Sequence, residues 1–428
     1  MTLFWFRRDL RVYDNLALYK ALLENESVLP IFIYDDNILQ NLSKDDARVS
    51  FIYESVFKIN ETLKSLGESL ATFYGNPIDI IKKICTEQHI SKIYINKDYE
   101  PYARKRDKEI YDFCKSSKIE LLYFKDQVIF EKNEILTNDN KPYTVFTPYS
   151  KKWKQRFQSI ILTHYKSEDY LHKFFPHQYK FLSLNDIGFI KSDIKIKDYQ
   201  IDENLIINYK ENRDFPYKYF TSYLSTHLRF GTVSIRRIIN DIKNYSSDTF
   251  LNELIWREFF MQILWHFPHT TTQSFKAKYD NIKWLNNETH FKLWCSGKTG
   301  YPLVDAGMRE LNATGLMHNR VRMVCASFLC KHLLIDWRWG EAYFAEKLLD
   351  FELSSNVGNW QWASGSGVDA APYFRIFNPI EQQKKFDKNF EYCKKWIPEF
   401  FTENYPEPII EHSVARARCL VTYKNALQ

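Results

Sequence analysis

Short apolar runs alternate with amphipathic segments over the first part of the chain. The runs LFWF, VLPIFIY, LATFY, KIYIN and ELLYF have the length of buried strands, and between them Ile52, Val56, Ile59 and Leu63 recur at helical spacing. Strands and helices in strict alternation predict a parallel sheet with helices packed on it. We therefore predict a Rossmann-like α/β domain over residues 1–130.

The rest of the chain follows a different pattern. Residues 131–205 are polar and irregular, and they contain Pro142, Pro148, Pro176 and the basic run KKWKQR. This composition predicts a long connection between domains. From residue 206 onward helical patterns dominate, so we predict an all-α domain over 206–428.

The predicted α/β domain lacks the usual dinucleotide-binding turn. A Rossmann fold binds the pyrophosphate with a glycine-rich turn after its first strand. Here that turn reads FRRDLR, and the domain contains only Gly67 and Gly75. Cofactor chemistry is therefore expected in the helical domain.

Charge and cysteine content narrow the class of protein. Lys and Arg total 59 against 53 Asp and Glu, and this net charge of +6 permits nucleic-acid binding without requiring it. The seven cysteines form no CxxC pair and are odd in number, which favours reduced, mostly buried thiols. His266 and His269 have no carboxylate or thiolate nearby, so no metal site is expected. No apolar stretch reaches about 18 residues, and we expect an untargeted cytoplasmic protein without a membrane segment.

Five segments carry a resemblance to a known family. They are FRRDLRVYDNLAL, TSYLSTHLRFG, NELIWREFF, GKTGYPLVDAGMRELNATGLMHNRVRM and NWQWASGSGVDAAPYFRIFNP, in that order. They are similar to segments of photolyases and cryptochromes, and the chain resembles the class I photolyases that split cyclobutane pyrimidine dimers (CPDs). The resemblance implies an α/β antenna domain followed by an all-helical domain that binds FAD.

The resemblance also implies which residues hold the FAD. Hydroxyls and backbone amides at the start of a helix suit an anion, which is how TSYLS would bind the flavin phosphates. Asn356 matches the position facing flavin N5, where an amide can exchange hydrogen bonds in more than one redox state. Relatives usually carry Asp where this chain has Glu352, so that contact is left open. The implied FAD-binding residues are Tyr209, Thr221, Ser222, Leu224, Ser225, Arg257, Arg322, Asp350, Glu352 and Asn356.

A second set of residues is implied to bind damaged DNA. Glu253 and Trp256 lie three residues apart, hence on one helix face, and match the acid and the aromatic that meet a flipped-out dimer. Stacking yields about 1 to 3 kcal/mol per base, comparable with the cost of extruding a damaged pair. MHNRVRM lacks the paired histidines of (6-4) photoproduct enzymes, and Leu316 departs from the usual Trp. The implied DNA or lesion contacts are Glu253, Trp256, Asn319, Arg320, Met323, Trp362, Arg213 and Arg375.

Three tryptophans are implied to carry electrons to the flavin. Trp360 and Trp362 are two residues apart, so in a helix they point in nearly opposite directions and cannot share a task. Trp360 matches the inner member of the family's electron-transfer chain, which Trp337 and then Trp284 continue outward. With Glu253 and Asn356, these three form the implied catalytic set.

We therefore expect light-driven repair of CPDs in DNA by a monomer that uses reduced FAD. A blue-light photoreceptor with the same pocket and a (6-4) photolyase are the alternatives, although such receptors usually extend well beyond YPEPIIEH. A light-independent flavoprotein would leave the tryptophans without a purpose. The antenna chromophore is open between a folate, a deazaflavin, another molecule and none, because Tyr102 and Ala103 replace the Asn-Glu of folate-binding relatives.

Overall fold

The chain forms two compact units in the computed structural model, which describes residues 1–218, 220–245 and 247–428. The first, called the α/β unit, comprises Met1–Glu134, Gln155–Gln200 and Tyr223–Ser246. The second, called the helical unit, comprises Ile135–Lys154, Ile201–Ser222 and Ser247–Gln428. The boundaries predicted at residues 130 and 205 differ from these, because both units draw on the predicted connection.

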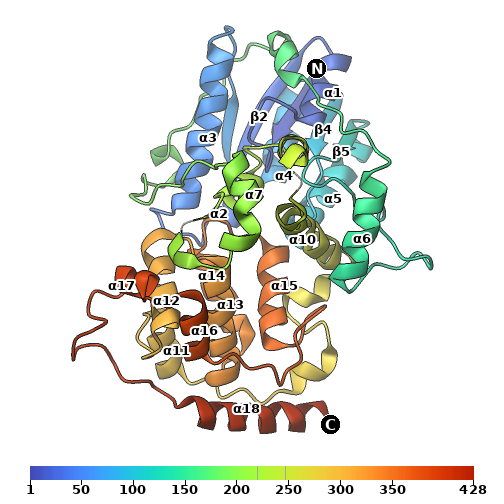
Figure 1. Ribbon diagram of the computed structural model, residues 1–428. Coiled ribbons are helices and arrows are strands. Elements are labelled where there is room, and N and C mark those ends of the chain that lie inside the picture. The colour runs from blue at the N-terminus through green and yellow to red at the C-terminus, as the bar shows by residue number, and fades with distance from the viewer. Residues whose placement is uncertain (219, 246) are drawn as a thin grey trace. The chain divides into compact units, whose positions relative to one another are not determined.

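The α/β unit contains the predicted parallel sheet (Figure 1). Its strands are β1 (Thr2–Phe6), β2 (Val28–Asp35), β3 (Ala71–Gly75), β4 (Lys92–Asn96) and β5 (Glu120–Phe124). All neighbours pair in parallel, in the order β3-β2-β1-β4-β5. The predicted α/β fold class is confirmed.

Side chains that alternate along β1 divide the core of this unit into two layers. Phe4 and Phe6 belong to a cluster with buried residues of α1 and α3, whereas Leu3 and Trp5 belong to one with residues of α4 and α5. Parallel sheets are covered on both faces because their crossover helices pack there. The helices of the unit are α1 (Leu16–Glu24), α2 (Asp36–Leu39), α3 (Ala47–Lys64), α4 (Pro77–Glu87), α5 (Pro101–Ser116), α8 (Leu224–Phe230) and α9 (Ile235–Ile242), with 3-10 turns at Ser167–Lys173, Asn185–Ile187 and Lys243–Tyr245.

A buried ion network joins segment 223–246 to the α/β unit. Arg236 lies 3.2 Å from Asp14 and 2.8 Å from Asp126. Arg11 lies 2.7 Å from Asp126 and donates a 3.0 Å hydrogen bond to the carbonyl of Gly231. Burial raises the pKa of Asp126, but Arg11 and Arg236 together hold that pKa below its ordinary value. This pairing explains why α8 and α9 belong to a unit that begins more than two hundred residues earlier.

The helical unit is built around α15. This helix packs against α10, α13 and α14, and two glycines allow the close approach. A Cβ on Gly358 would lie 2.5 Å from Phe260 Cε1 in α10, and one on Gly340 in α14 would overlap Trp360. The helices are α7 (Glu203–Asn212), α10 (Asp248–His266), α11 (Glu288–Cys295), α12 (Pro302–Thr314), α13 (Asn319–Ser327), α14 (Trp337–Lys347), α15 (Leu353–Ser364), α16 (Pro379–Phe386), α17 (Glu391–Trp396) and α18 (His412–Leu427).

Shorter elements complete the helical unit. A π-helix, Phe328–His332, continues directly from α13. The 3-10 turns are Pro216–Lys218, Pro268–Thr271 and Ala277–Asn281, and α6 (Phe146–Phe157) begins in this unit and ends in the α/β unit. Among the described residues, no helix has the length and apolar character needed to cross a membrane. All seven cysteines are free, and all but the half-buried Cys295 are buried, as predicted.

Candidate active site

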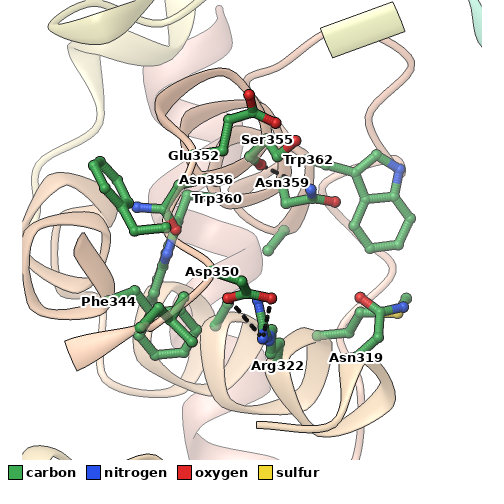
Figure 2. A pocket seen from close by; sticks show the side chains of 15 residues that line it. Asn319, Arg322, Phe344, Asp350, Glu352, Ser355, Asn356, Asn359, Trp360 and Trp362 are labelled. Atoms are coloured by element: carbon green, nitrogen blue, oxygen red, sulfur yellow. Dashed lines mark hydrogen bonds and ion pairs between the residues drawn. The ribbon is translucent and has the colours of Figure 1, made fainter. Parts of the chain in front are cut away.

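A pocket of about 90 Å³ opens in the helical unit beside α15 (Figure 2). Its lining comes from α13, α14, α15 and the link between the last two. The lining residues are Asn319, Arg322, Met323, Ala326, Phe344, Leu348, Asp350, Phe351, Glu352, Ser355, Asn356, Asn359, Trp360, Trp362 and Ala363. Eight of the predicted site residues meet in this one place.

Arg322 and Asp350 form an ion pair at the wall of the pocket. Arg322 Nη2 lies 3.0 and 3.1 Å from the two carboxylate oxygens of Asp350, as the dashed lines in Figure 2 mark. Arg322 Nε also donates to the carbonyl of Met317 at 2.7 Å, which fixes the guanidinium plane. A fixed guanidinium provides positive charge and N–H donors to whatever fills the pocket.

The amide of Asn356 is oriented by Glu341, a residue that sequence reasoning missed. Asn356 Nδ2 donates to the Glu341 carbonyl at 3.0 Å and to Glu341 Oε1 at 2.8 Å. Burial raises the pKa of Glu341, whereas the hydrogen bond from Asn356 lowers it. Because the amide nitrogen is engaged, the oxygen is the atom of Asn356 that remains to accept a hydrogen bond from a ligand.

Trp360 and Trp362 have different surroundings, as their spacing predicts. Trp360 is 2% exposed and makes edge contacts with Trp294 and Phe344, at ring distances of 6.1 and 5.0 Å. Trp362 is half-buried and lies on the other side of the pocket in Figure 2. Trp360 thus faces the core, and Trp362 can present an aromatic surface to a ligand.

Glu352, the departure from the family pattern, forms an ion pair with Arg257. Glu352 Oε2 lies 3.4 Å from Arg257 Nε, and Glu352 is buried at the pocket wall. Both were predicted to bind FAD. The Arg257 guanidinium therefore meets the longer carboxylate of Glu352.

Four charged residues near the pocket form a chain of ion pairs. Glu253 pairs with Arg213, and Arg320 Nη2 lies 2.7 Å from Asp214 Oδ1. Arg213 Nε lies 4.0 Å from the same Asp214 oxygen, which links the two pairs. Burial raises the pKa of Glu253, while Arg213 lowers it. Arg213 and Arg320, which were predicted to hold DNA phosphates, each have a carboxylate partner in the structure. Their contact with DNA stays a prediction.

Trp256 lies in an aromatic stack that the sequence did not reveal. The ring of Phe146 lies 3.7 Å from that of Trp256, with 5° between their planes. Trp153 in the same helix as Phe146 donates to the buried Glu258 at 2.7 Å and so holds α6 against α10. Trp256 and Glu253 do not line the pocket. Phe146 covers one face of Trp256, which leaves at most the other face for a base.

The predicted phosphate-binding run is divided between the two units. Thr221 and Ser222 end a segment of the helical unit, whereas Leu224 and Ser225 begin α8 in the α/β unit. The residue before α8 is Tyr223, whose φ of 53° is left-handed and whose side chain makes no capping bond. Tyr209 lies in α7, with the Arg213 guanidinium 5.4 Å from its ring.

The three predicted electron-transfer tryptophans share one core. Trp360 and Trp337 are buried in the main cluster of the helical unit, and the half-buried Trp284 packs against it. Trp337 Nε1 has no hydrogen-bond partner among the described residues. Trp284 makes an edge contact of 6.0 Å with Tyr423. The ring contacts of Trp360 go instead to Trp294 and Phe344, and no sequence motif had singled out Trp294.

Comparison with known proteins identifies the family. The family model for DNA photolyase matches residues 2–168, and that for the FAD-binding domain of DNA photolyase matches residues 250–403. Deoxyribodipyrimidine photo-lyase of Escherichia coli is 34% identical over 479 residues, which cover 99% of this chain and 98% of that protein. The chain belongs to the photolyase/cryptochrome family.

Solved structures of family members share the fold. A class III photolyase from Agrobacterium tumefaciens superposes with a TM-score of 0.89 at 31% identity, covering 99% of this chain and 97% of that one. An archaeal photolyase from Sulfolobus tokodaii, solved with two FAD molecules, gives 0.84 at 31% identity over 99% of both chains.

The pocket lies within the family's FAD-binding domain, and its side chains fit this cofactor. All fifteen lining residues fall inside the matched range 250–403. Trp360 and Phe344 provide flat apolar walls, Asn356 provides an oriented acceptor, and Arg322 provides a fixed cation. This combination suits a ring that has polar edges and carries a negative charge when reduced. The chain is therefore an FAD-binding member of its family.

Proposed function

We propose that this protein repairs cyclobutane pyrimidine dimers in DNA with blue light. One observation carries the proposal: residues assigned to the flavin and residues assigned to the lesion line the same pocket. Arg322, Asp350 and Asn356 belong to the first group, and Asn319, Met323 and Trp362 to the second. A dimer bound there would lie beside the ring from which it must receive an electron. The E. coli relative named deoxyribodipyrimidine photo-lyase supports the same reaction.

The side chains of the pocket divide the work. FAD, when bound in its reduced form, supplies the light-driven electron that opens the cyclobutane ring. Asn356, held by Glu341, accepts a hydrogen bond from the ligand edge that faces it. Arg322, which is paired with Asp350, offers its remaining N–H groups to negative charge on the same ligand. Trp362 stacks on a flipped-out pyrimidine and excludes water from it.

Glu253 acts on the dimer itself in this proposal. Its pKa is raised by burial, so a proton is retained more readily than on an exposed carboxyl group. A protonated or hydrogen-bonded carboxyl near a pyrimidine carbonyl stabilises negative charge as it develops there. Arg213 must then exchange part of its contact with Glu253 for a contact with DNA.

One assay tests the proposal against its alternatives. The FAD-loaded protein is reduced with dithionite and illuminated with three oligonucleotides, which carry a CPD, a (6-4) photoproduct or no lesion. We expect restored thymines from the CPD substrate alone. Restoration of the (6-4) substrate would make the protein a (6-4) photolyase. No repair of either substrate, with reduced flavin that persists after illumination, would make it a photoreceptor.

We also propose that the protein binds a second, antenna chromophore, whose chemical class the comparisons extend. The Sulfolobus relative was solved with two FAD molecules, which adds a flavin to the folate and deazaflavin candidates for an antenna. The cytoplasmic location and the monomeric state stay predictions.

A further inference from the structure

Lys331 is a buried lysine that the flavin and lesion assignments leave unexplained. Its side chain is 2% exposed, and no carboxylate forms an ion pair with it in the part of the chain that the structure describes. Burial lowers its pKa to about 8, and the charge of Arg375 lowers it as well, so the ammonium form prevails at neutral pH. An unpaired buried charge costs several kcal/mol. Such a cost is typical of residues retained for function.

The partner of Lys331 lies in the segment 365–378, which connects α15 to α16. Lys331 Nζ donates to the main-chain carbonyl of Arg375 at 2.9 Å. Lys331 itself lies in the π-helix Phe328–His332, where Leu333 N bonds to Phe328 O across five residues. The wider turn of a π-helix reorients side chains and is common at functional sites.

One side of the segment around Arg375 packs against the protein core, and the other side is exposed to solvent. Tyr373 and Ile376 pack against the cluster that contains Cys419 and Tyr423, and the Tyr373 and Tyr423 rings stack at 5.9 Å. Phe374 is 61% exposed, and Arg375 is exposed too. The bond from Lys331 therefore ties the main chain at the point from which the Arg375 side chain leaves the surface.

The other end of the segment reaches the predicted lesion site. Asp369 accepts a 3.2 Å hydrogen bond from the backbone N–H of Phe146, the residue that stacks on Trp256. The segment also follows Trp362 in the chain, at the end of α15. One short stretch thus joins the aromatic residues assigned to the dimer with an exposed arginine assigned to phosphate.

We propose that Lys331 is a positioning residue for DNA binding, which holds the main chain at Arg375 so that the guanidinium is presented to a DNA phosphate. The inference rests on the proposed function through the assignment of Arg375. Lys331 touches neither DNA nor flavin; it acts through Arg375. A positioned arginine binds phosphate more tightly than a mobile one because less side-chain and loop entropy is lost on binding.

A positioning role and a structural role of Lys331 predict different effects of Lys331→Met on stability and on DNA affinity. Replacing a buried charge by an apolar side chain of similar length is often neutral or stabilising. We therefore expect the FAD content and the melting temperature of Lys331→Met to equal or exceed those of the wild type. Its dissociation constant for DNA should rise by about 3- to 10-fold, which corresponds to a coupling of ordinary size between residues in contact.

A double-mutant cycle on the FAD-loaded protein tests whether the effect passes through Arg375. Affinity for fluorescent duplexes, with and without a CPD, is measured for Lys331→Met alone and in the backgrounds Arg375→Ala and Arg213→Ala. In the Arg375→Ala background, Lys331→Met should change the affinity by less than about 2-fold, because the group it positions is absent. In the Arg213→Ala background the full loss should persist. An equal loss in both backgrounds would overturn the inference.

A second variant covers the case in which Lys331→Met does not fold. The undamaged duplex separates the role of Lys331 from the proposed repair activity. Lys331→Gln retains an N–H donor without the charge, so it should lose less affinity than Lys331→Met; if Lys331→Met does not fold, the same cycle is run with Lys331→Gln. If the proposed function is wrong, the wild type will not repair CPDs. The coupling between Lys331 and Arg375 in affinity for undamaged DNA still decides the role of Lys331 in that case. Repair without coupling would overturn this inference alone.

Discussion

Adding one methyl group at Gly340 should displace Trp360 and so change the wall of the flavin pocket that this indole forms. A Cβ at this position in α14 would lie 2.5 Å from Leu329 Cδ2 and closer still to the six-membered ring of Trp360. Carbon atoms pack at about 3.5 to 4.0 Å. The indole, the leucine or the helix must therefore move by about 1 Å or more, and the indole is the group that borders the pocket.

The size of the effect follows from two opposing terms. Overpacking a core costs about 1 to 3 kcal/mol. This site should be near the upper end because the added Cβ overlaps both Trp360 and Leu329. Replacing glycine by alanine inside a helix returns about 1 kcal/mol. Gly340→Ala should therefore lose about 2 kcal/mol of unfolding free energy, or about 4 to 8 °C in melting temperature for a unit of this size.

Flavin content and photoreduction separate a pocket effect from a general loss of stability. Gly340→Ala should show a lower ratio of flavin to protein absorbance and slower light-driven reduction of its flavin. Gly307→Ala is the matched control, because a Cβ there would lie 3.0 Å from Cys325 Sγ and closer to Val321, two residues of α13 that do not line the pocket. It should lose comparable stability while it keeps its flavin. Unchanged flavin content and photoreduction in Gly340→Ala would refute the view that this contact fixes Trp360.

Three further predictions concern electron transfer, the lesion site and pH. Trp337→Phe should abolish photoreduction of oxidised flavin but leave dithionite-primed repair nearly normal; parallel loss of both would make Trp337 a packing residue. Glu253→Ala should lower the repair quantum yield more than lesion affinity, and Trp256→Ala should do the reverse; the opposite pattern in binding and repair assays would reject both roles. Burial lowers the pKa of His318 to about 4, with help from the Arg322 charge, so the unfolded chain binds the proton first as the pH falls. Between pH 7 and 5 the wild type should lose up to about 2 kcal/mol more unfolding free energy than His318→Asn, whose amide oxygen can replace the capping Nδ1 of the histidine; equal losses in urea titrations would contradict this.

The local sequence pattern was sufficient to predict those features that depend only on a residue's own helix or strand. The apolar runs predicted the strands, and the helix expected from Ile52 to Leu63 lies within α3. The two-residue separation of Trp360 and Trp362 predicted that they face different ways, because helix geometry fixes relative direction within one turn. The FAD-binding domain and eight of its pocket residues were expected for a related reason: long segments such as NWQWASGSGVDAAPYFRIFNP carry several site residues on one element.

Pairing between distant segments was decided only by the tertiary structure. No periodicity says that Glu341 will orient Asn356, that Phe146 will stack on Trp256 or that Arg213 will meet Glu253. Helices were predicted from residue 206 onward, and α8 and α9 are helices, but their membership in the α/β unit comes from Arg236 meeting Asp14 and Asp126. Sequence determines propensity, period and local direction, because these depend on neighbours along the chain. Which charges and rings meet depends on the path of the whole backbone, and that path is fixed by burial summed over many residues at once.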